Sequence, residues 1–305
     1  MEIFYDLGKS PPTHDFINFL VRAEQARVLN REESIQIRFV RGYRKLSDRD
    51  KVYSNERRDW RVVNLLFNLC WLLPSVDDVS FGDGEQFHSY LNFGEPQKPV
   101  LKVPLAAASV VSKALEGIEN PVSITFRQSD FELTRNSNIR AWSDVADWLK
   151  ANGCTPIIVP DAEADMLNRH VDTGHFTYKA AAHSVQIKLA LYEQCKVNLM
   201  TTGGPMVLAL FSDVPLMAFK LIIPGLKCTT ESHMRKSAMS EDDDWGEYKK
   251  LFWGNDDADY IIGKLEQLLP KFLSVDRRQS NDCFLANKAI PAAGALANAT
   301  TAKGR

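Results

Sequence analysis

The sequence has no paired-cysteine motif. Its five cysteines are scattered and odd in number, and no two of them form a C-x-x-C pair. A disulfide framework and a zinc knuckle are therefore not expected, and a reducing cytosol fits the sequence best. Three of the cysteines lie in or beside apolar runs, where a free thiol usually packs as a small hydrophobic side chain: Cys70, Cys154 and Cys195.

Long hydrophobic runs and a large excess of one charge are also missing. The most apolar stretches, at 62–76 and 214–226, are too short for a bilayer and contain polar residues or prolines. The N-terminus carries Glu2 and no long apolar segment, which argues against a signal peptide. The formal net charge of −2 argues against a nucleic-acid partner. We expect a cytoplasmic protein without a transmembrane segment.

The sequence does contain an alternation of apolar strands and amphipathic helices. In the first part we predict strands at 2–7, 34–40 and 76–81, with helices at 14–29 (after a Thr13 cap) and 60–73. This βαβαβ order requires a parallel sheet with crossover helices. A proline-rich stretch at 92–109 then leads into the second part.

The second part repeats the plan of the first without a strict sequence repeat. We predict strands at 121–127, 155–161, 196–202 and 214–221, and helices at 107–117, 138–151, 182–195, 206–212 and 257–273. The expected fold class is α/β, with two Rossmann-like domains that face each other across a cleft. We place the domains at 1–95 and 96–273, followed by a disordered tail at 274–305.

One loop of the second part carries side chains suited to an anion. In a doubly wound sheet, ligands bind where strands end and loops enter the next helices. Arg127 and Arg135 flank such a point, and their planar guanidinium groups suit phosphate oxygens. The helix expected from Asn138 would add free backbone N–H groups. Alternatively, the two arginines pair with Asp130 and Glu132 as a surface ion network.

A second turn of this part has almost no side chains. It follows an apolar strand and consists of Thr201, Thr202, Gly203, Gly204 and Pro205. Glycines let the backbone approach a ligand, and proline suits the first turn of a helix. Such a turn can also be purely structural. Together with the arginine loop, however, it favours a phosphate site.

Two Rossmann-like halves, a proline-rich linker and a strand–Gly-Gly-Pro–helix unit late in the second half resemble a glycosyltransferase of the GT-B type. The resemblance implies that the second half binds a nucleotide diphosphate sugar as substrate, with no other cofactor and no metal, and that the first half faces the acceptor. Phe126-Arg127-Gln128 also weakly resembles the fucosyltransferase-like branch, in which an arginine neutralises the donor's diphosphate. That branch usually has a histidine and two adjacent arginines, so the sugar stays open.

The resemblance also implies site residues. On the donor side they are Arg127, Asp130, Arg135, Asn136, His183, Thr201, Thr202, Gly203, Gly204 and Pro205. For His183, a role as an ordinary core histidine is the alternative. Candidates for a catalytic base that takes a proton from the acceptor of an inverting transfer are His14, Asp15 and Asp6. Alternatively, His14 and Asp15 only begin a helix.

The basic segment 41–61 is the one local excess of positive charge. It suits an acceptor such as an anionic glycan or a lipid headgroup, which would place the protein peripherally at a membrane. A solvated loop is the alternative. Asp242-Asp243-Asp244 superficially resembles a metal-binding triplet, but a solvated turn fits better. Two rival functions remain: a nucleotide-sugar epimerase, and a non-catalytic nucleotide-sugar-binding or assembly protein.

Overall fold

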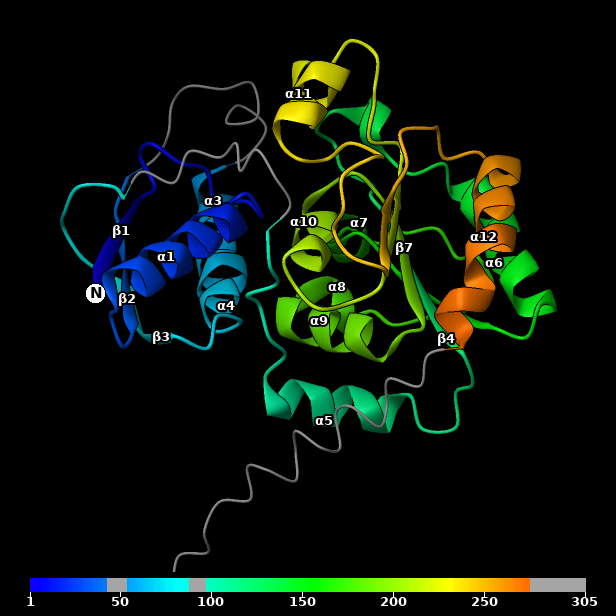
Figure 1. Cartoon of the computed structure of the whole chain (residues 1–305), viewed down its shortest axis with the longest axis horizontal. Helices are drawn as coiled ribbons and strands as arrows, with labels where there is room; N and C mark the ends of the chain where they lie inside the picture. Colours follow the sequence, from blue (N-terminus) through cyan, green and yellow to red (C-terminus); the bar gives the residue numbers. More distant parts are fainter. Residues whose placement is uncertain (43–53, 88–96, 275–305) are drawn as a thin grey trace, which may run out of the picture.

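The computed structural model describes residues 1–42, 54–87 and 97–274. These residues form two parallel sheets, one from each half of the chain, with helices packed beside them (Figure 1). Most of the basic segment expected as a loop, the start of the expected linker, and nearly all of the expected tail lie outside the described residues. The division at 95–96 therefore stays a prediction.

The first sheet has the order β1-β2-β3. The elements of this half are β1 (Glu2–Asp6), α1 (Phe16–Asn30), β2 (Ile35–Val40), α3 (Asn55–Arg61), the π-helical turn η1 (Val62–Leu66), α4 (Phe67–Cys70) and β3 (Val76–Phe81). Both crossovers move in the same direction along the sheet, and right-handed crossovers then place both sets of helices on the same face. Burial alternates along β2, where Ile35, Ile37 and Phe39 are fully buried. The aromatic rings of Tyr5 and Phe16 meet edge to face above them.

Two helix starts in this half differ from the prediction. Thr13 does not cap α1: it lies in a preceding turn, where its hydroxyl accepts a hydrogen bond from the Asp15 N–H at 3.3 Å. The helix expected from Trp60 begins at Asn55, because Ser54 caps it by accepting from the Arg57 N–H at 3.3 Å. The arginines of this stretch therefore lie on a helix and not on a solvated loop.

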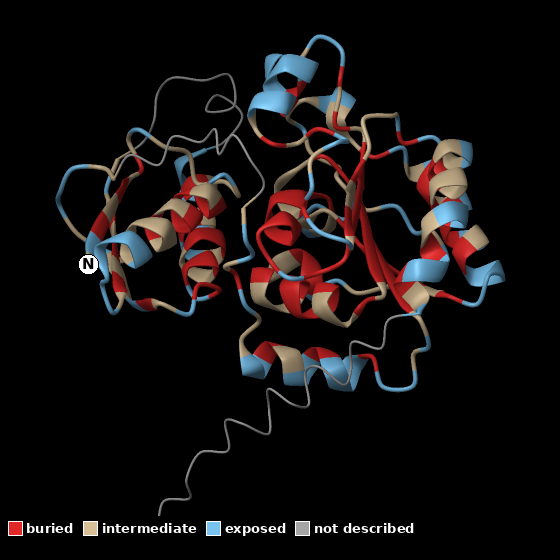
Figure 2. Ribbon diagram, in the orientation of Figure 1, coloured by how far each residue is buried: buried red, intermediate tan, exposed pale blue. Residues whose placement is uncertain are grey.

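The second sheet has the order β6-β5-β4-β7-β8-β9. Its strands are β4 (Pro121–Thr125), β5 (Thr155–Val159), β6 (Phe176–Thr177), β7 (Val197–Thr201), β8 (Leu216–Phe219) and β9 (Lys249–Leu251). Counted within this half, the order is 3-2-1-4-5-6, which is the doubly wound arrangement. The central strands β4, β7 and β8 are buried along their whole length, as Figure 2 shows. The short strands β6 and β9 were not predicted.

Helices cover both faces of the second sheet. They are α5 (Leu105–Ala114), α6 (Ile139–Ala151), α7 (Ala162–Met166), α8 (Ala180–His183), α9 (Val185–Gln194), α10 (Gly204–Leu210), α11 (Glu231–Lys236) and α12 (Ala258–Leu273), with 3₁₀ turns at Leu133–Arg135 and Lys227–Thr229. Trp142 of α6 and Ile261 of α12 pack on Ile124 of β4. On the opposite face, Tyr192 of α9 hydrogen-bonds the Thr125 hydroxyl at 2.7 Å.

The two halves share a hydrophobic cluster. It contains Phe39 and Leu69 from the first half and Leu189 and Met206 from the second. Helices α4 and α9 contact each other across this junction. The shared apolar packing places the carboxyl ends of strands from both sheets beside one common space.

A buried carboxylate anchors the start of α6. Asp256 is 1% exposed, and its Oδ2 accepts hydrogen bonds from the Asn138 N–H at 2.6 Å and the Trp142 indole N–H at 3.2 Å. Its other oxygen pairs with the Lys220 ammonium at 3.0 Å. This one side chain therefore ties the β4–α6 loop to the ends of β8 and β9.

We expect Asp256→Ala to lower the free energy of unfolding by about 3 kcal/mol, because the buried Trp142 indole N–H, the Asn138 N–H and the half-buried Lys220 ammonium lose the acceptor that they share. Asp257→Ala is the matched control, since Asp257 is exposed and its side chain makes no cap hydrogen bond. Urea unfolding of both variants measures the difference. Equal losses in the two variants would contradict this role for Asp256.

Candidate functional site

A cleft of about 870 Å³ lies between the two halves. From the first half it is lined by the β1–α1 loop and by α3, and from the second half by residues that follow β4, β5 and β7. In the sheet order, β4 and β7 are neighbours at the point where the strand order reverses. The cleft therefore opens where a doubly wound sheet binds ligands.

The structure brings the two turns singled out in the sequence together. Arg127 follows β4, Gly203 follows the adjacent parallel strand β7, and both line this cleft. A Cβ atom on Gly203 would lie 3.8 Å from Cδ of Arg127. Pairing of the two strands in parallel is sufficient to produce this convergence, because their carboxyl ends meet at one edge.

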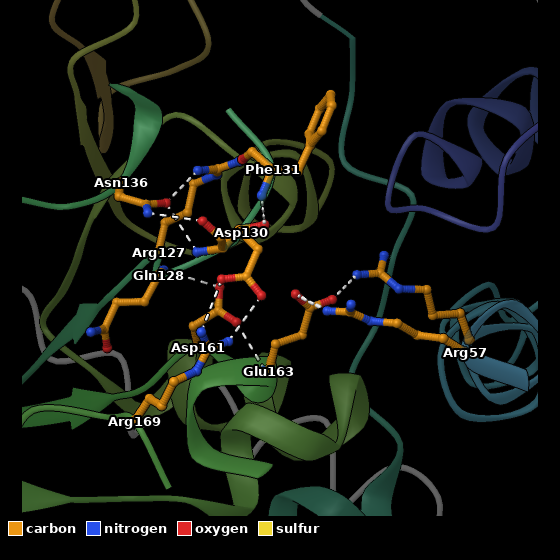
Figure 3. Close-up of polar contacts among 11 residues, drawn as sticks. Arg57, Arg127, Gln128, Asp130, Phe131, Asn136, Asp161, Glu163 and Arg169 are labelled. Atoms are coloured by element: carbon orange, nitrogen blue, oxygen red, sulfur yellow. Dashed lines mark hydrogen bonds and ion pairs between the residues drawn. The ribbon is translucent and has the colours of Figure 1, made fainter. Parts of the chain in front are cut away.

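The guanidinium group of Arg127 holds its own loop. Its Nη1 donates to the Glu132 carbonyl at 3.1 Å and to Oδ1 of Asn136 at 2.6 Å, and its Nη2 donates to the Phe131 carbonyl at 2.7 Å (Figure 3). Asn136 also accepts from the Ser129 N–H at 3.0 Å. Arg127 and Asn136 thus clamp the loop, and Asn136 does not line the cleft.

The predicted surface ion network is only partly present. Arg135 pairs with Glu132 at 2.8 Å, whereas Asp130 pairs with Arg169 at 3.0 Å and lies outside the cleft lining. The Arg169 guanidinium lowers the pKa of the exposed Asp130 carboxyl. Arg135 lines the cleft, and its buried Nε has no hydrogen-bond partner among the described residues.

Gly204 is glycine because a histidine from the other half lies against it. A Cβ on Gly204 would lie 2.2 Å from Nδ1 and 2.7 Å from Cβ of His14. The sequence predicted a turn left bare for a ligand and a helix from residue 206. Instead α10 begins at Gly204, and the space that a side chain would occupy there is filled by His14. At Gly203, by contrast, a Cβ would make only ordinary contacts.

His14 is a half-buried, neutral base candidate. Its Nε2 is buried and has no hydrogen-bond partner among the described residues. Burial above all, together with the positive charges of Lys188 and Arg61, lowers the pKa of His14 from its ordinary value of 6.5 to about 3. The imidazole is therefore uncharged at neutral pH and can accept a hydrogen bond or a proton.

The other predicted residues divide between the cleft and its surroundings. Asp15 is exposed and lines the cleft. Asp6 does not line it: its carboxylate accepts from the Gly8 N–H at 2.7 Å and pairs with Lys9 at 3.4 Å. His183 lines the cleft and bonds Asp165 at 2.8 Å. The buried Thr201 and Thr202 and the half-buried Pro205 also line it, beside the two glycines.

An ion pair between the halves was not predicted. Arg57 of α3 pairs with Glu163 of α7 (Figure 3). Arg61 of α3 pairs with the same carboxylate at 2.6 Å. The two arginines are four positions apart, so one face of a helix presents both. That spacing would have identified them if the segment had been assigned to a helix.

Lys188 and Asp161 also line the cleft and were not singled out in the sequence. Asp161 caps α7 by accepting from the Glu163 N–H at 2.9 Å, and burial raises the pKa of its carboxyl. Lys188 lies three residues after Val185 and four before Tyr192, so helical spacing places it on the buried face of α9. This spacing was the signal in the sequence that could have identified Lys188 as a buried residue.

No protein-family model matches this chain, and no curated protein matches it. Solved structures do resemble it. A glycosyl transferase family 9 protein from Veillonella parvula shares 11% identity at a TM-score of 0.52, covering 88% of this chain and 97% of that one. The E. coli heptosyltransferase WaaC with ADP shares 10% sequence identity with this chain at a TM-score of 0.45, and the match covers 89% of this chain and 100% of that one. E. coli ADP-heptose lps heptosyltransferase II shares 11% sequence identity at a TM-score of 0.43, and the match covers 88% of this chain and 76% of that one.

The first of these similarities confirms the predicted fold class: mixed α/β with parallel sheets, as in glycosyltransferases of the GT-B type. At this identity the similarity concerns the fold alone. None of the three structures is described as a fucosyltransferase, so that branch stays a prediction.

Neither a membrane-spanning helix nor a metal-binding cluster is present among the described residues. Within residues 1–42, 54–87 and 97–274, no helix has both the length and the apolar character that a membrane span requires. In the same ranges, no group of three or more His, Cys, Asp or Glu side chains is arranged to hold a metal ion. The expectation of metal-independent chemistry is untested by this observation.

We expect Gly204→Ala to destabilise the protein by roughly 1–3 kcal/mol, because the new methyl group overlaps the His14 ring. Gly203→Ala is the matched control, and its methyl group meets only ordinary contacts. Urea unfolding compares the two variants. If Gly203→Ala is as destabilising as Gly204→Ala, the contact between His14 and Gly204 is not what selects glycine.

The lowered pKa of His14 predicts a pH dependence of stability. Below pH 6.5 the unfolded chain protonates this histidine while the folded protein does not, so stability is lost as the pH falls from 6.5 toward 3. The contribution approaches about 1.4 kcal/mol per pH unit. We expect His14→Gln to remove this part of the acid sensitivity in urea titrations. Parallel pH profiles for wild type and variant would contradict the prediction.

Proposed function

We propose that this protein is a glycosyltransferase. It transfers a sugar from a nucleotide diphosphate sugar to an acceptor hydroxyl, with inversion and without a metal ion. The observation that carries the proposal is the neutral His14, whose buried Nε2 lies in a cleft with cationic side chains at the reversal point of a doubly wound sheet. A neutral base beside positive charge suits proton removal next to a departing anion.

The donor would bind at the carboxyl ends of β4 and β7. The Arg135 guanidinium and the hydroxyl groups of Thr201 and Thr202 line this side of the cleft and can bind phosphate oxygens. Arg127 acts by fixing the loop that carries Arg135, and Gly203 leaves room for close approach. These residues come from the half that the GT-B resemblance assigns to the donor.

The chemistry needs one proton acceptor and one anion stabiliser. Nε2 of His14 takes the proton of the acceptor hydroxyl while its oxygen forms a bond to the anomeric carbon. The bond from that carbon to the diphosphate oxygen breaks, and the nucleoside diphosphate leaves with the electron pair. Positive charge in the cleft stabilises the negative charge that develops on the leaving group.

The acceptor would enter from the first half. Arg57 and Arg61 face the cleft there, held by Glu163. An anionic acceptor, such as an acidic glycan or a lipid headgroup, would compete with Glu163 for these guanidinium groups. A lipid-linked acceptor would bring this cytoplasmic enzyme to the membrane surface. The sugar stays open, with a fucosyltransferase-like specificity as one prediction.

The test begins with a thermal-shift screen of nucleotides and nucleotide diphosphate sugars, followed by an assay for release of the nucleoside diphosphate from each hit. We expect His14→Gln to lower turnover by roughly 10²–10⁴-fold while donor binding is retained, because the base is lost and the donor contacts are not. Asp6→Asn is the control, since Asp6 lies outside the cleft lining.

Each outcome has a distinct meaning. Donor binding without turnover in the wild type would favour a binding protein. Turnover of the nucleotide sugar to an isomer, with no nucleoside diphosphate released, would favour an epimerase. The absence of any nucleotide-dependent shift at millimolar concentration would overturn the proposed function.

A further inference from the structure

Lys188 is a buried lysine at the wall of the cleft. It is 5% exposed, lies on α9, and lines the cleft between the halves. The described residues offer its ammonium group no hydrogen bond and no ion pair. Lys249 shows the usual alternative: it is 6% exposed, and its ammonium donates to the carbonyls of Leu210 and Ser212, each at 2.7 Å.

A buried ammonium without acceptors is costly, so its retention at a cleft wall points to a ligand that supplies them. The ligand must be negatively charged or rich in acceptors, because an ammonium group has three donors and no acceptor. Neutral water alone would satisfy the hydrogen bonds but would not offset the charge.

The surrounding charges support an anion. Asp161 is the opposite charge that acts on Lys188, and its carboxylate also accepts from the N–H groups of Gln128, at 3.2 Å, and Glu163, at 2.9 Å. The carboxylate of Glu163 forms ion pairs with the two arginines of α3. His14, on the other side, is uncharged at neutral pH. Lys188, Arg57 and Arg61 carry three positive charges against the two negative charges of Asp161 and Glu163, so positive charge is in excess at this wall of the cleft.

We infer that Lys188 binds a phosphate oxygen of the donor's diphosphate, together with the residues that follow β4 and β7. The inference rests on the proposed function and adds a donor-binding residue to it. It also couples the two substrates, since the charge of Lys188 is one cause of the low pKa of His14. An anion bound to Lys188 offsets that charge, so His14 becomes a better proton acceptor once the donor is in place.

The test uses isothermal titration calorimetry of the full chain with inorganic pyrophosphate and with the nucleoside diphosphates of the four common bases. We expect Lys188→Met to weaken binding roughly ten- to a hundredfold at neutral pH, the range for a charge-assisted hydrogen bond. Lys249→Met is the matched control. It should lower the melting temperature, because two carbonyls lose their donor, and leave the affinity unchanged. Lys188→Met should not lower the melting temperature.

Measuring the affinity as a function of pH distinguishes the loss of the Lys188 charge from a change in the shape of the cleft wall. Burial lowers the pKa of Lys188 to about 8, so the wild type should bind nucleoside diphosphate more weakly as the pH rises from about 7 to about 9. The other charged groups at this wall are Asp161, Glu163, Arg57 and Arg61, and the titratable but uncharged His14 lies with them. All of them remain in Lys188→Met, so a flatter profile in that variant assigns the dependence to Lys188.

The outcomes distinguish this inference from the proposed function. Equal affinities for wild type, Lys188→Met and Lys249→Met would overturn the role of Lys188 and leave the glycosyltransferase proposal standing. Binding of pyrophosphate that depends on Lys188, with no nucleoside diphosphate bound, would support the anion site and overturn the nucleotide donor. No binding of any of these anions by the wild type would overturn both.

Discussion

The contact between His14 and Gly204 is the constraint on which the cleft depends. It joins the first loop of one half to the first turn of α10 in the other, and it leaves no room for a side chain at residue 204. The two halves therefore meet through a specific fit and not only through apolar packing. Nδ1 of the histidine lies at this contact, and its other ring nitrogen, Nε2, is buried as well.

The protonation state of His14 follows from the burial of its imidazole. Removing the imidazole from water favours its neutral form, and the nearby Lys188 and Arg61 reinforce the effect. Lys188 is also buried and has no hydrogen-bond or ion-pair partner among the described residues, whereas Arg57 and Arg61 are held by Glu163 from the opposite half. The cleft thus contains a neutral base, an unpartnered ammonium and a pair of guanidinium groups that an anion can compete for. This is the charge distribution expected for a reaction in which an anion departs as a proton is removed.

Much of the fold could be predicted because the strands of both sheets are short apolar runs bounded by polar loops. β3 at Val76–Phe81 agrees with its predicted range. The predicted start of α6 differs from the observed one by only one residue, because Asn138 is a strong cap. α3 was predicted too late because Ser54 lies inside a long polar stretch, where its capping role is hard to recognise. β6 and β9 have too few residues to give a periodic signal.

The site was predictable in location but not in detail. Adjacent parallel strands must bring the loops after β4 and β7 together, so the convergence of Arg127 and Gly203 followed from topology. The hydrogen-bond partners of the arginines could not be predicted from the sequence. Carboxylates were expected as partners of Arg127, but its guanidinium group donates to backbone carbonyls. The partner of Gly204 lies nearly two hundred residues away along the chain, and no local pattern reports such a contact.

The most direct measurement is a crystal structure of the protein with the nucleoside diphosphate that binds it most tightly. The account predicts the diphosphate in the cleft between the halves, with its oxygens within hydrogen-bond distance of Lys188 and of residues after β4 and β7, and with His14 facing the vacated sugar position. A nucleotide bound elsewhere, such as in the smaller cavity of the first half beside Arg41 and Phe81, would contradict it.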